Sequence, residues 1–455
     1  MEQLLAAAER MRFFRHLLLW VVIGIGVGYA AKSFAGASAG TFDASLINSG
    51  DTAWMLASSS LVMIMTPAVG FFYGGMVSAK NVVSVIKQSM IILALISVQW
   101  VVVGYSLAFG PDSGHGIVGT LQYFGLRGVG FAPDANYAAT IPALVFMVFQ
   151  AMFAIVTPAL IIGAFVERIK FKTLVVFTLL WATLIYDPVA HWVWSPNGWL
   201  HALGALDFAG GTVVHMTAGF SALAAALLVG KRLETHHPGS TANNVPFVIL
   251  GAALLWFGWF GFNAGSALAS GALAASAFVV TNTAAAAAAL TWVALSWAEN
   301  KRPSAMAAAI GAVCGLVAIT PASGYVGPVA SIAIGILGGA VTYLAVYIRG
   351  RAIRIDDSLD VWAGHGIGGL TGAILTGVFA EKAINAAGAD GALFGNPHQL
   401  VVQLIAVAAV GVYSFVATWL ILKILAIIKF PLRVSAKEEA EGLDIAVHGE
   451  AAYRI

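Results

Sequence analysis

The chain has 455 residues, of which 60% are hydrophobic and 10% are charged, and its formal net charge at pH 7 is +2. This composition indicates an integral membrane protein, and it excludes a nucleic-acid partner because no basic face is rich enough to neutralise phosphates. A single cysteine, Cys314, excludes an intrachain disulfide, and since CxxC and HExxH spacings are absent we predict no metal or other cofactor.

The first 40 residues are typical of a leader. Three arginines precede a short apolar run over 17–31, and small residues follow around Ala37. A positively charged start, a short apolar core and a small-residue site favour a cleaved signal peptide over residues 1–40. An uncleaved additional helix is the alternative, and both choices deliver Asp51 to the outside.

Eleven apolar segments follow that are long enough to cross about 30 Å of hydrocarbon at about 1.5 Å per residue. They lie at 53–75, 84–109, 141–166, 173–194, 209–230, 246–267, 275–297, 304–320, 327–348, 361–381 and 399–428. The chain between them is short and polar, with 109–138 the longest exception. We therefore predict an all-α polytopic membrane protein with a transmembrane domain over 41–428.

Lysine and arginine are distributed unevenly among the loops. When alternate loops are assigned to the cytoplasm, most basic residues fall on that side, against Lys32, Arg127 and Lys382 on the other. The positive-inside rule then predicts the N-terminus outside after removal of the leader, and a cytoplasmic tail over 429–455. The chain is expected in the cell (inner) membrane as a multi-pass protein.

Echoes along the chain indicate two halves of opposite orientation. The motif GFFYGG ends span one and GWFGFNAG ends span six, while spans five and ten each open with an aspartate, Asp207 or Asp360, and then reach a histidine. We therefore predict an inverted five-helix repeat over about 52–230 and 246–382, plus a last helix at 399–428. Inverted repeats place the substrate path at their interface.

Those two histidines, His215 and His365, are the deepest of the ten within predicted spans. A charged imidazolium at that depth costs several kcal/mol, so both rings are expected to be neutral and hydrogen-bonded. A neutral imidazole has one donor and one acceptor nitrogen, so two bonded rings can line a narrow path for a small polar solute. The alternative is two unrelated core histidines, each bonded to a backbone carbonyl.

The aspartates of these spans also have a structural interpretation. Asp207 and Asp360 fit N-caps, which satisfy free backbone N–H groups and contribute about 1 kcal/mol. Asp207 can in addition supply negative potential at the outer mouth. Asp187 of span four is expected to cap the break at Pro188 or to add to that field, and we favour the structural role.

Glycines in spans five and ten predict close helix contact rather than phosphate binding. They are Gly210, Gly211, Gly219, Gly364, Gly366, Gly368, Gly369 and Gly372.

The segment DFAGGTVVHMTAGFSALAAALLVGKR at 207–232 resembles the signature segment of the ammonium transporter family (Amt/Mep/Rh), and DDSLDVWAGHG at 356–366 is similar to its second histidine segment. The motifs FFYGGMVSAKN, FVERIKF, AHWVW and WFGWFGFNAGSA extend the likeness over 52–455, in the manner of a bacterial Amt. The resemblance implies a transporter rather than an enzyme, with no catalytic residue. It also implies eleven helices per subunit and a homotrimer with one pore in each subunit.

The resemblance assigns roles to individual residues. It implies His215 and His365 as the twin histidines of the pore, Phe149 and Phe153 as a stacked outer gate, Trp194, Ser266 and Phe149 as the recruitment site, and Trp259 and Phe262 as pore-adjacent aromatics. Aromatic faces attract a small cation by about 0.5–2 kcal/mol, and a serine hydroxyl accepts one of its hydrogens. Ammonium is expected to bind there, in the field of Asp207, to lose its proton, and to pass the histidines as ammonia.

The last segment, 433–455, is charged, and its composition alone favours a disordered tail. Its EGLD and HGEAAY motifs resemble the family's cytoplasmic tail, which packs under the trimer and helps to receive PII signalling proteins. Ammonium or ammonia, with methylammonium as an analogue, the lipid bilayer and a PII protein are thus the expected partners. The alternatives are an Rh-type channel for carbon dioxide or methylamine, an ammonium sensor, and an intramembrane enzyme with a metal held by the two histidines and an aspartate.

Overall fold

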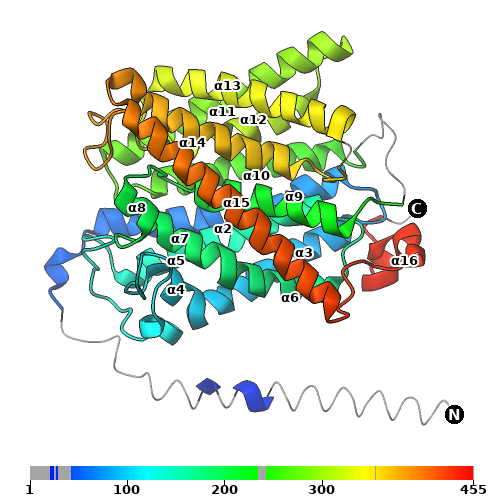
Figure 1. Ribbon diagram of the computed structural model, residues 1–455, viewed down its shortest axis with the longest axis horizontal. Helices are drawn as coiled ribbons and strands as arrows, with labels where there is room; N and C mark the ends of the chain where they lie inside the picture. The colour runs from blue at the N-terminus through cyan, green and yellow to red at the C-terminus, as the bar shows by residue number, and fades with distance from the viewer. Residues whose placement is uncertain (1–20, 25–26, 29–41, 234–241, 354, 454–455) are drawn as a thin grey trace.

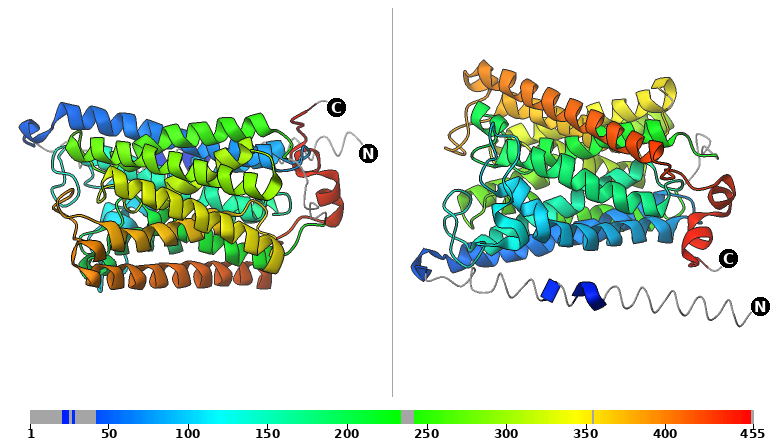
Figure 2. Two further views of the ribbon diagram at one scale, coloured as in Figure 1. Left: turned by 90° about the horizontal axis from the view of Figure 1, so that it is seen from above. Right: turned by 60° about the horizontal axis from the view of Figure 1, so that its bottom comes forward.

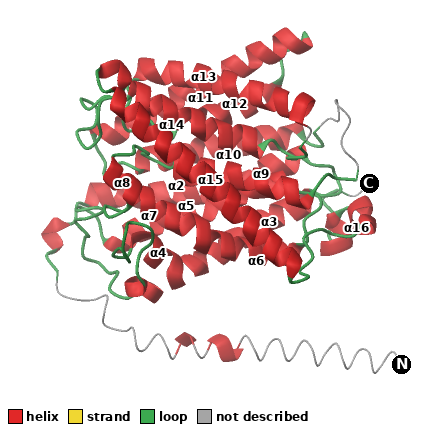
Figure 3. Ribbon diagram, in the orientation of Figure 1, coloured by secondary structure: helices red, strands yellow, loops and turns green. Residues whose placement is uncertain are grey.

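The computed structural model describes residues 21–24, 27–28, 42–233, 242–353 and 355–453. Within these ranges the regular structure is helical, with isolated bridges and no named strand. Long helices lie side by side in one bundle (Figures 1 and 3). The predicted leader over 1–40 falls almost entirely outside the described residues, so it stays a prediction.

Nine helical segments of the described chain are long and apolar enough to cross a membrane. They are Ser49–Met76, Val82–Phe109, Ala143–Ala164, Phe171–Leu203, Gly211–Val229, Val245–Ala264, Ala272–Asn300, Pro328–Ile353 and Pro397–Ile427. Because lipid offers no hydrogen bonds to the backbone, such segments take a form that pairs every N–H and C=O internally. The chain is therefore a multi-pass membrane protein.

Two further helices occupy the remaining predicted positions. Helix α12 (Ala305–Ile319) is short, and the segment made of η9 (Trp362–Ile367) and α14 (Gly368–Phe379) is rich in glycine. Both lie within the bundle, where α12 packs against α11 (Ala272–Asn300) and α14 packs against α12. Each of the eleven predicted positions is thus helical, although nine of the described segments meet the length and hydropathy expected of a span.

Several spans contain a π-helical turn next to ordinary α-helix. Span five begins with η6 (Gly211–Met216) and continues as α9 (Thr217–Val229), while span six is α10 (Val245–Trp259) followed by η7 (Phe260–Ala264). Span two is α3 (Val82–Gln99), η2 (Trp100–Gly104) and α4 (Tyr105–Phe109), and span four is α6 (Phe171–Trp181), η5 (Ala182–Tyr186), α7 (Asp187–Trp194) and α8 (Trp199–Leu203). The remaining spans are α2 (Ser49–Met76), α5 (Ala143–Ile161) extended by η4 (Ile162–Ala164), α13 (Pro328–Ile348) extended by η8 (Arg349–Ile353), and α15 (Pro397–Ile427). π-Helical turns are often found at functional sites, and His215 and His365 each lie in one.

Glycine lets spans five and ten touch backbone to backbone. A Cβ atom added to Gly219 would lie 2.1 Å from the amide nitrogen of Gly366, and one on Gly369 would lie 2.6 Å from the carbonyl oxygen of Gly211. The predicted role of these glycines in close helix contact is confirmed. For Gly364 the prediction is wrong, since an added Cβ would meet nothing within 4 Å. Gly364 instead lines a cavity.

The C-terminal segment folds against one end of the bundle, where α16 (Ala436–Glu441) and η11 (Asp444–His448) lie (Figures 1 and 2). The amide of Val434 donates to the Arg168 carbonyl at 3.0 Å, and the Lys80 ammonium donates to the Ala440 carbonyl at 2.8 Å. The carboxylate of Asp444 accepts from backbone N–H groups at the start of α3, at 2.7 and 3.0 Å. The disordered tail favoured by composition is therefore wrong for the described part of this segment, because loops of other spans supply its partners.

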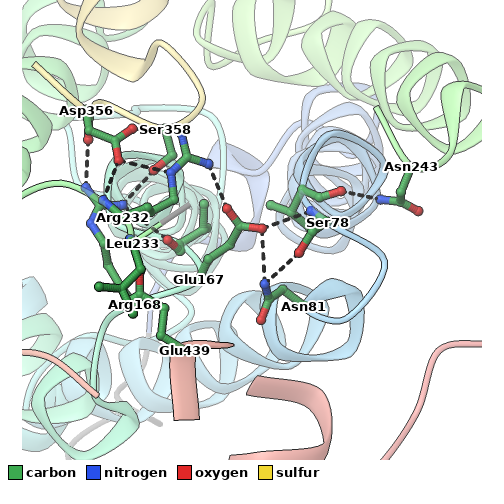
Figure 4. Close-up of polar contacts among 12 residues, drawn as sticks. Ser78, Asn81, Glu167, Arg168, Arg232, Leu233, Asn243, Asp356, Ser358 and Glu439 are labelled. Carbon is green, nitrogen blue, oxygen red and sulfur yellow. Dashed lines mark hydrogen bonds and ion pairs between the residues drawn. The ribbon is translucent and has the colours of Figure 1, made fainter. Parts of the chain in front are cut away.

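A buried arginine ties the loops beneath this segment together (Figure 4). Arg168 is fully buried, and each of its five N–H groups has an acceptor. The acceptors are the carbonyls of Ala164, Val166, Gly230 and Asp356 and the hydroxyl of Ser358. The loops that follow spans three and five and precede span ten thus meet on one side chain.

Arg232 is a second arginine that joins these loops. Its guanidinium binds both oxygens of Asp356, at 2.7 and 3.0 Å, and one oxygen of Glu167 at 2.7 Å. Burial raises the pKa of Glu167, but the charge and hydrogen bond of Arg232, together with hydrogen bonds from Ser78, hold that pKa below its usual value. The loops predicted to share the cytoplasmic side therefore share one end of the bundle.

Candidate functional site

The two deep histidines meet inside the bundle. His215 comes from η6 and His365 from η9, and their Nδ1 atoms are 3.3 Å apart. The ring centroids are 5.3 Å apart with the planes inclined by 27°, and the residues are 1% and 7% exposed. The alternative of two unrelated histidines, each bonded to a backbone carbonyl, is therefore wrong, because each ring bonds the other.

Asp207 prepares the start of span five. Its carboxylate accepts from four successive backbone N–H groups at the start of η6, those of residues 210–213, at 2.7–3.2 Å. The predicted capping interpretation is confirmed for Asp207. Its backbone carbonyl accepts from the indole of Trp194 at 3.0 Å, so the cap also positions that ring.

Two other acids, Asp360 and Asp187, do not cap the helices that begin near them. At the start of span ten the amide of Trp362 donates to Asp357 at 2.7 Å, while Asp360 pairs with Arg349. A left-handed φ of 56° at Asp360 separates its carboxylate from the helix start. Asp187 likewise accepts from the side-chain amide of Gln99 at 2.8 Å, so it joins spans two and four rather than capping the break at Pro188.

The aromatic residues around Phe153 form one continuous group next to the histidines. Phe153 lies 4.9 Å from Phe149, 4.4 Å from Phe262 and 5.8 Å from Trp194, measured between ring centroids. Phe149 and Phe153 meet edge to face at 68°, so the expected stacked pair is wrong in geometry. An edge-to-face contact suits the ring quadrupoles and lets Phe153 contact all three neighbours. Both rings are buried.

Ser266 closes the turn beside this group. Its hydroxyl donates to the Phe262 carbonyl at 2.8 Å, which leaves its lone pairs to accept hydrogens. The neighbouring Gly265 lies against the ring of Phe149, since an added Cβ would be 2.8 Å from a ring carbon. The structure thus brings Ser266, Phe149 and Trp194 to one region, as the sequence resemblance implies.

His215 is also packed against aromatic rings. Trp259 lies 5.5 Å and Phe262 lies 5.9 Å from its ring centroid, the latter nearly parallel at 15°. The indole of Trp259 donates to the hydroxyl of Thr320 at 2.9 Å, and Nε2 of His215 lies 3.3 Å from the same oxygen. Sequence reasoning missed Thr320, because a threonine that ends a helix before a proline carries no signal of such a contact.

Two cavities meet at His365. One of about 10 Å³ has an almost wholly apolar lining that includes both histidines, Trp259 and Phe262. That volume matches a single water-sized molecule. The other, of about 360 Å³, runs from His365 past Cys314 toward Arg232 and Arg349, at the end of the bundle that carries the C-terminal segment.

The chain is similar to known proteins over most of its length. The Ammonium Transporter Family profile matches residues 53–453. The ammonium transporter of Bacillus subtilis is 48% identical over 405 residues, covering 89% of this chain and 98% of that protein. Ammonium transporter Amt1 of Archaeoglobus fulgidus is 47% identical over 407 residues, covering 90% and 100%. The crystal structure of Saccharomyces cerevisiae Mep2 superposes with a TM-score of 0.81 at 37% identity, covering 86% of this chain and 89% of that one.

Proposed function

The chain belongs to the ammonium transporter family, and from this premise we propose that it carries ammonium nitrogen across the membrane as ammonia, along a path lined by His215 and His365. It is a transporter rather than an enzyme. The observation that carries the proposed path is the direct contact of two buried imidazoles between an aromatic group and a cavity of about 360 Å³.

Recruitment comes first in the proposed sequence of events. The faces of Trp194 and Phe149 attract a small cation, and the lone pairs of Ser266 accept its hydrogens. The carboxylate of Asp207, whose backbone carbonyl accepts from the indole of Trp194, adds a negative field, while its oxygens stay occupied by helix N–H groups. It therefore acts through potential and through the position of the indole, rather than as a ligand.

Ammonium then gives its proton to water at the recruitment site, because the path beyond that site is apolar and disfavours the charged form. The rings of Phe149 and Phe153 are buried and fill the entrance, so a charged solute loses its hydration there. Neutral ammonia can enter the cavity of about 10 Å³, which both imidazoles line. Phe149 and Phe153 then act as the gate, since Phe153 contacts Phe149, the indole of Trp194 and Phe262.

The finer organisation is proposed on the sequence pattern together with the same resemblance. We assign eleven spans in two inverted halves, 52–230 and 246–382, with 399–428 as the last span, a leader over 1–40 and a bacterial Amt type. The distribution of basic residues among the loops favours a first span that starts outside and a cytoplasmic tail over 429–455. The chain as a whole is proposed to lie in the inner membrane. A homotrimer and a PII partner at the tail complete this proposal.

Solid-supported-membrane electrophysiology on proteoliposomes, together with methylammonium uptake, tests the function. Ammonium pulses should give a current or uptake in the wild type that falls sharply in His215→Ala and His365→Ala. His398→Ala, which changes an exposed histidine at the start of α15, is the matched control. Full activity in both pore variants would refute the twin-histidine path. Conduction of carbon dioxide without competition by ammonium would favour the Rh-type alternative, and a purified chain that moves no substrate would favour a sensor.

A further inference from the structure

The hydrogen bonds around Thr320 determine which nitrogen of each pore histidine carries hydrogen. We propose that Thr320 is a positioning residue that locks the tautomers of His215 and His365, and that the lock leaves Nε2 of His365 as the one free acceptor of the pair. Thr320 is fully buried at the end of α12, where its hydroxyl faces three groups.

The hydroxyl hydrogen of Thr320 is used in a hydrogen bond to the Leu316 carbonyl. The Thr320 Oγ1 atom lies 2.7 Å from the carbonyl oxygen of Leu316, one helical turn earlier. Two oxygens approach this closely only with a hydrogen between them, and a carbonyl has none. The single hydrogen of the hydroxyl therefore points at Leu316, which leaves two lone pairs on Oγ1.

Those lone pairs face two nitrogens. The indole nitrogen of Trp259 lies 2.9 Å away and can only donate. The other neighbour is Nε2 of His215 at 3.3 Å. Since Oγ1 has no second hydrogen to give, this contact is a hydrogen bond only if His215 carries its hydrogen on Nε2. The opposite tautomer would set a nitrogen lone pair against an oxygen lone pair.

The tautomer of His215 determines the tautomer of His365. Both histidines are neutral because a charged imidazole is costly in an apolar interior. With its hydrogen on Nε2, His215 presents a lone pair at Nδ1, so the 3.3 Å contact requires His365 to donate from its own Nδ1. Nε2 of His365 is then bare, and within the described residues it has no hydrogen-bond partner. His365 lines both cavities, so this acceptor is available to a passing solute.

The consequence for conduction rests on the proposed function. A path whose histidines could exchange tautomers freely would offer acceptors on either ring, whereas the locked pair offers one, on the ring nearer the larger cavity. Ammonia that has passed His215 can donate a hydrogen to Nε2 of His365 before it enters that cavity. The hydroxyl of Thr320 thus gives the pair a fixed polarity without contacting the solute.

Solid-state NMR of the full chain in lipid, with ¹⁵N-labelled histidine, tests the lock directly. Protonated and bare imidazole nitrogens have well-separated shifts, and the pair can be assigned from the cross-peak between the two Nδ1 atoms. The wild type should show hydrogen on Nε2 of His215 and on Nδ1 of His365. Thr320→Val removes the hydroxyl at nearly constant volume, and loss of one neutral hydrogen bond should shift the tautomer ratio by about 2- to 13-fold.

Two variants control this measurement. Thr320→Ser keeps the hydroxyl and should restore the wild-type tautomers, and Trp259→Phe removes the other donor but should leave them unchanged, because the hydroxyl hydrogen remains on Leu316. A wild-type spectrum with a bare Nε2 on His215, or an unchanged spectrum in Thr320→Val, would overturn the inference. If Thr320→Val does not fold, the wild-type spectrum still tests the inference, because the hydrogen must lie on Nε2 of His215 and on Nδ1 of His365. A wild type with the expected tautomers and no transport would instead count against the proposed function.

Discussion

Replacing Gly219 by alanine should separate the two pore histidines without touching either ring. The added Cβ would lie 2.1 Å from the amide nitrogen and 2.2 Å from the Cα of Gly366, whereas ordinary contacts begin near 3.4 Å. Both obstacles are backbone atoms, so spans five and ten must part by about 1 Å because packed helices cannot absorb the overlap elsewhere. The Nδ1 atoms of His215 and His365, already 3.3 Å apart, would then lie beyond hydrogen-bond distance.

The expected loss combines two effects. Overpacking in a tight core costs about 1–3 kcal/mol, and the broken hydrogen bond costs about 0.5–1.5 kcal/mol. Thermal unfolding in detergent measures the change in stability, and methylammonium uptake by proteoliposomes measures the change in transport. Gly364→Ala is the matched control, because the same added methyl group would meet nothing within 4 Å. Equal stability and equal uptake in the two variants would show that the backbone contact does not hold the histidines together.

Three further predictions concern the C-terminal segment and the larger cavity. Asp444→Ala should lower stability by about 0.5–2 kcal/mol, because it removes the carboxylate that caps α3, and Asp444→Asn should fall between this variant and the wild type in thermal unfolding. The pKa of Glu438 is lowered from 4.5 to about 2 by the Ser435 backbone N–H and by Lys170, so its contribution to docking should be full above pH 4.5 and should be lost as the pH falls toward 2. Limited proteolysis with an acid protease would follow this release, and resistance that does not change over that range would contradict it. Since Cys314 is the chain's single cysteine and lines the larger cavity, a small methanethiosulfonate should label it in the folded wild type and slow uptake, with Cys314→Ser as the unlabelled control. Labelling only after denaturation would contradict the expectation that a reagent in this cavity reaches the thiol.

The spans and the histidine contact could be predicted because their causes are local or periodic. Apolar length determines which segments enter lipid, and the depth of His215 and His365 in segments of opposite direction leads to their meeting. The aromatic group around Phe153 could be expected only by family resemblance, since Phe149 and Trp194 taken singly are typical of ordinary core residues. The structure adds that they share Phe153 as a common neighbour.

Other features depend on partners that are distant in the sequence. From the sequence alone, any of Asp356, Asp357 and Asp360 could cap the start of span ten. Their roles differ because Asp360 has a left-handed φ and pairs with Arg349, while Asp356 pairs with Arg232. The polar C-terminal segment resembles a disordered tail until the loops that receive it are known. The role of Thr320 could not be predicted from the sequence, because its hydroxyl contacts Trp259 and His215 only in the folded chain.

The docking of the C-terminal segment has a consequence for biogenesis. Residues 434–448 leave the ribosome after every span they touch, yet they cover the loop of Arg168 and cap the start of α3. The bundle must therefore be inserted by the translocon with this face still incomplete, and the face closes only once synthesis has passed Asp444. A chain arrested before that point would expose Arg168 and its neighbours to proteases that survey newly made membrane proteins, so a late stop codon should reduce cellular abundance even though every span is present.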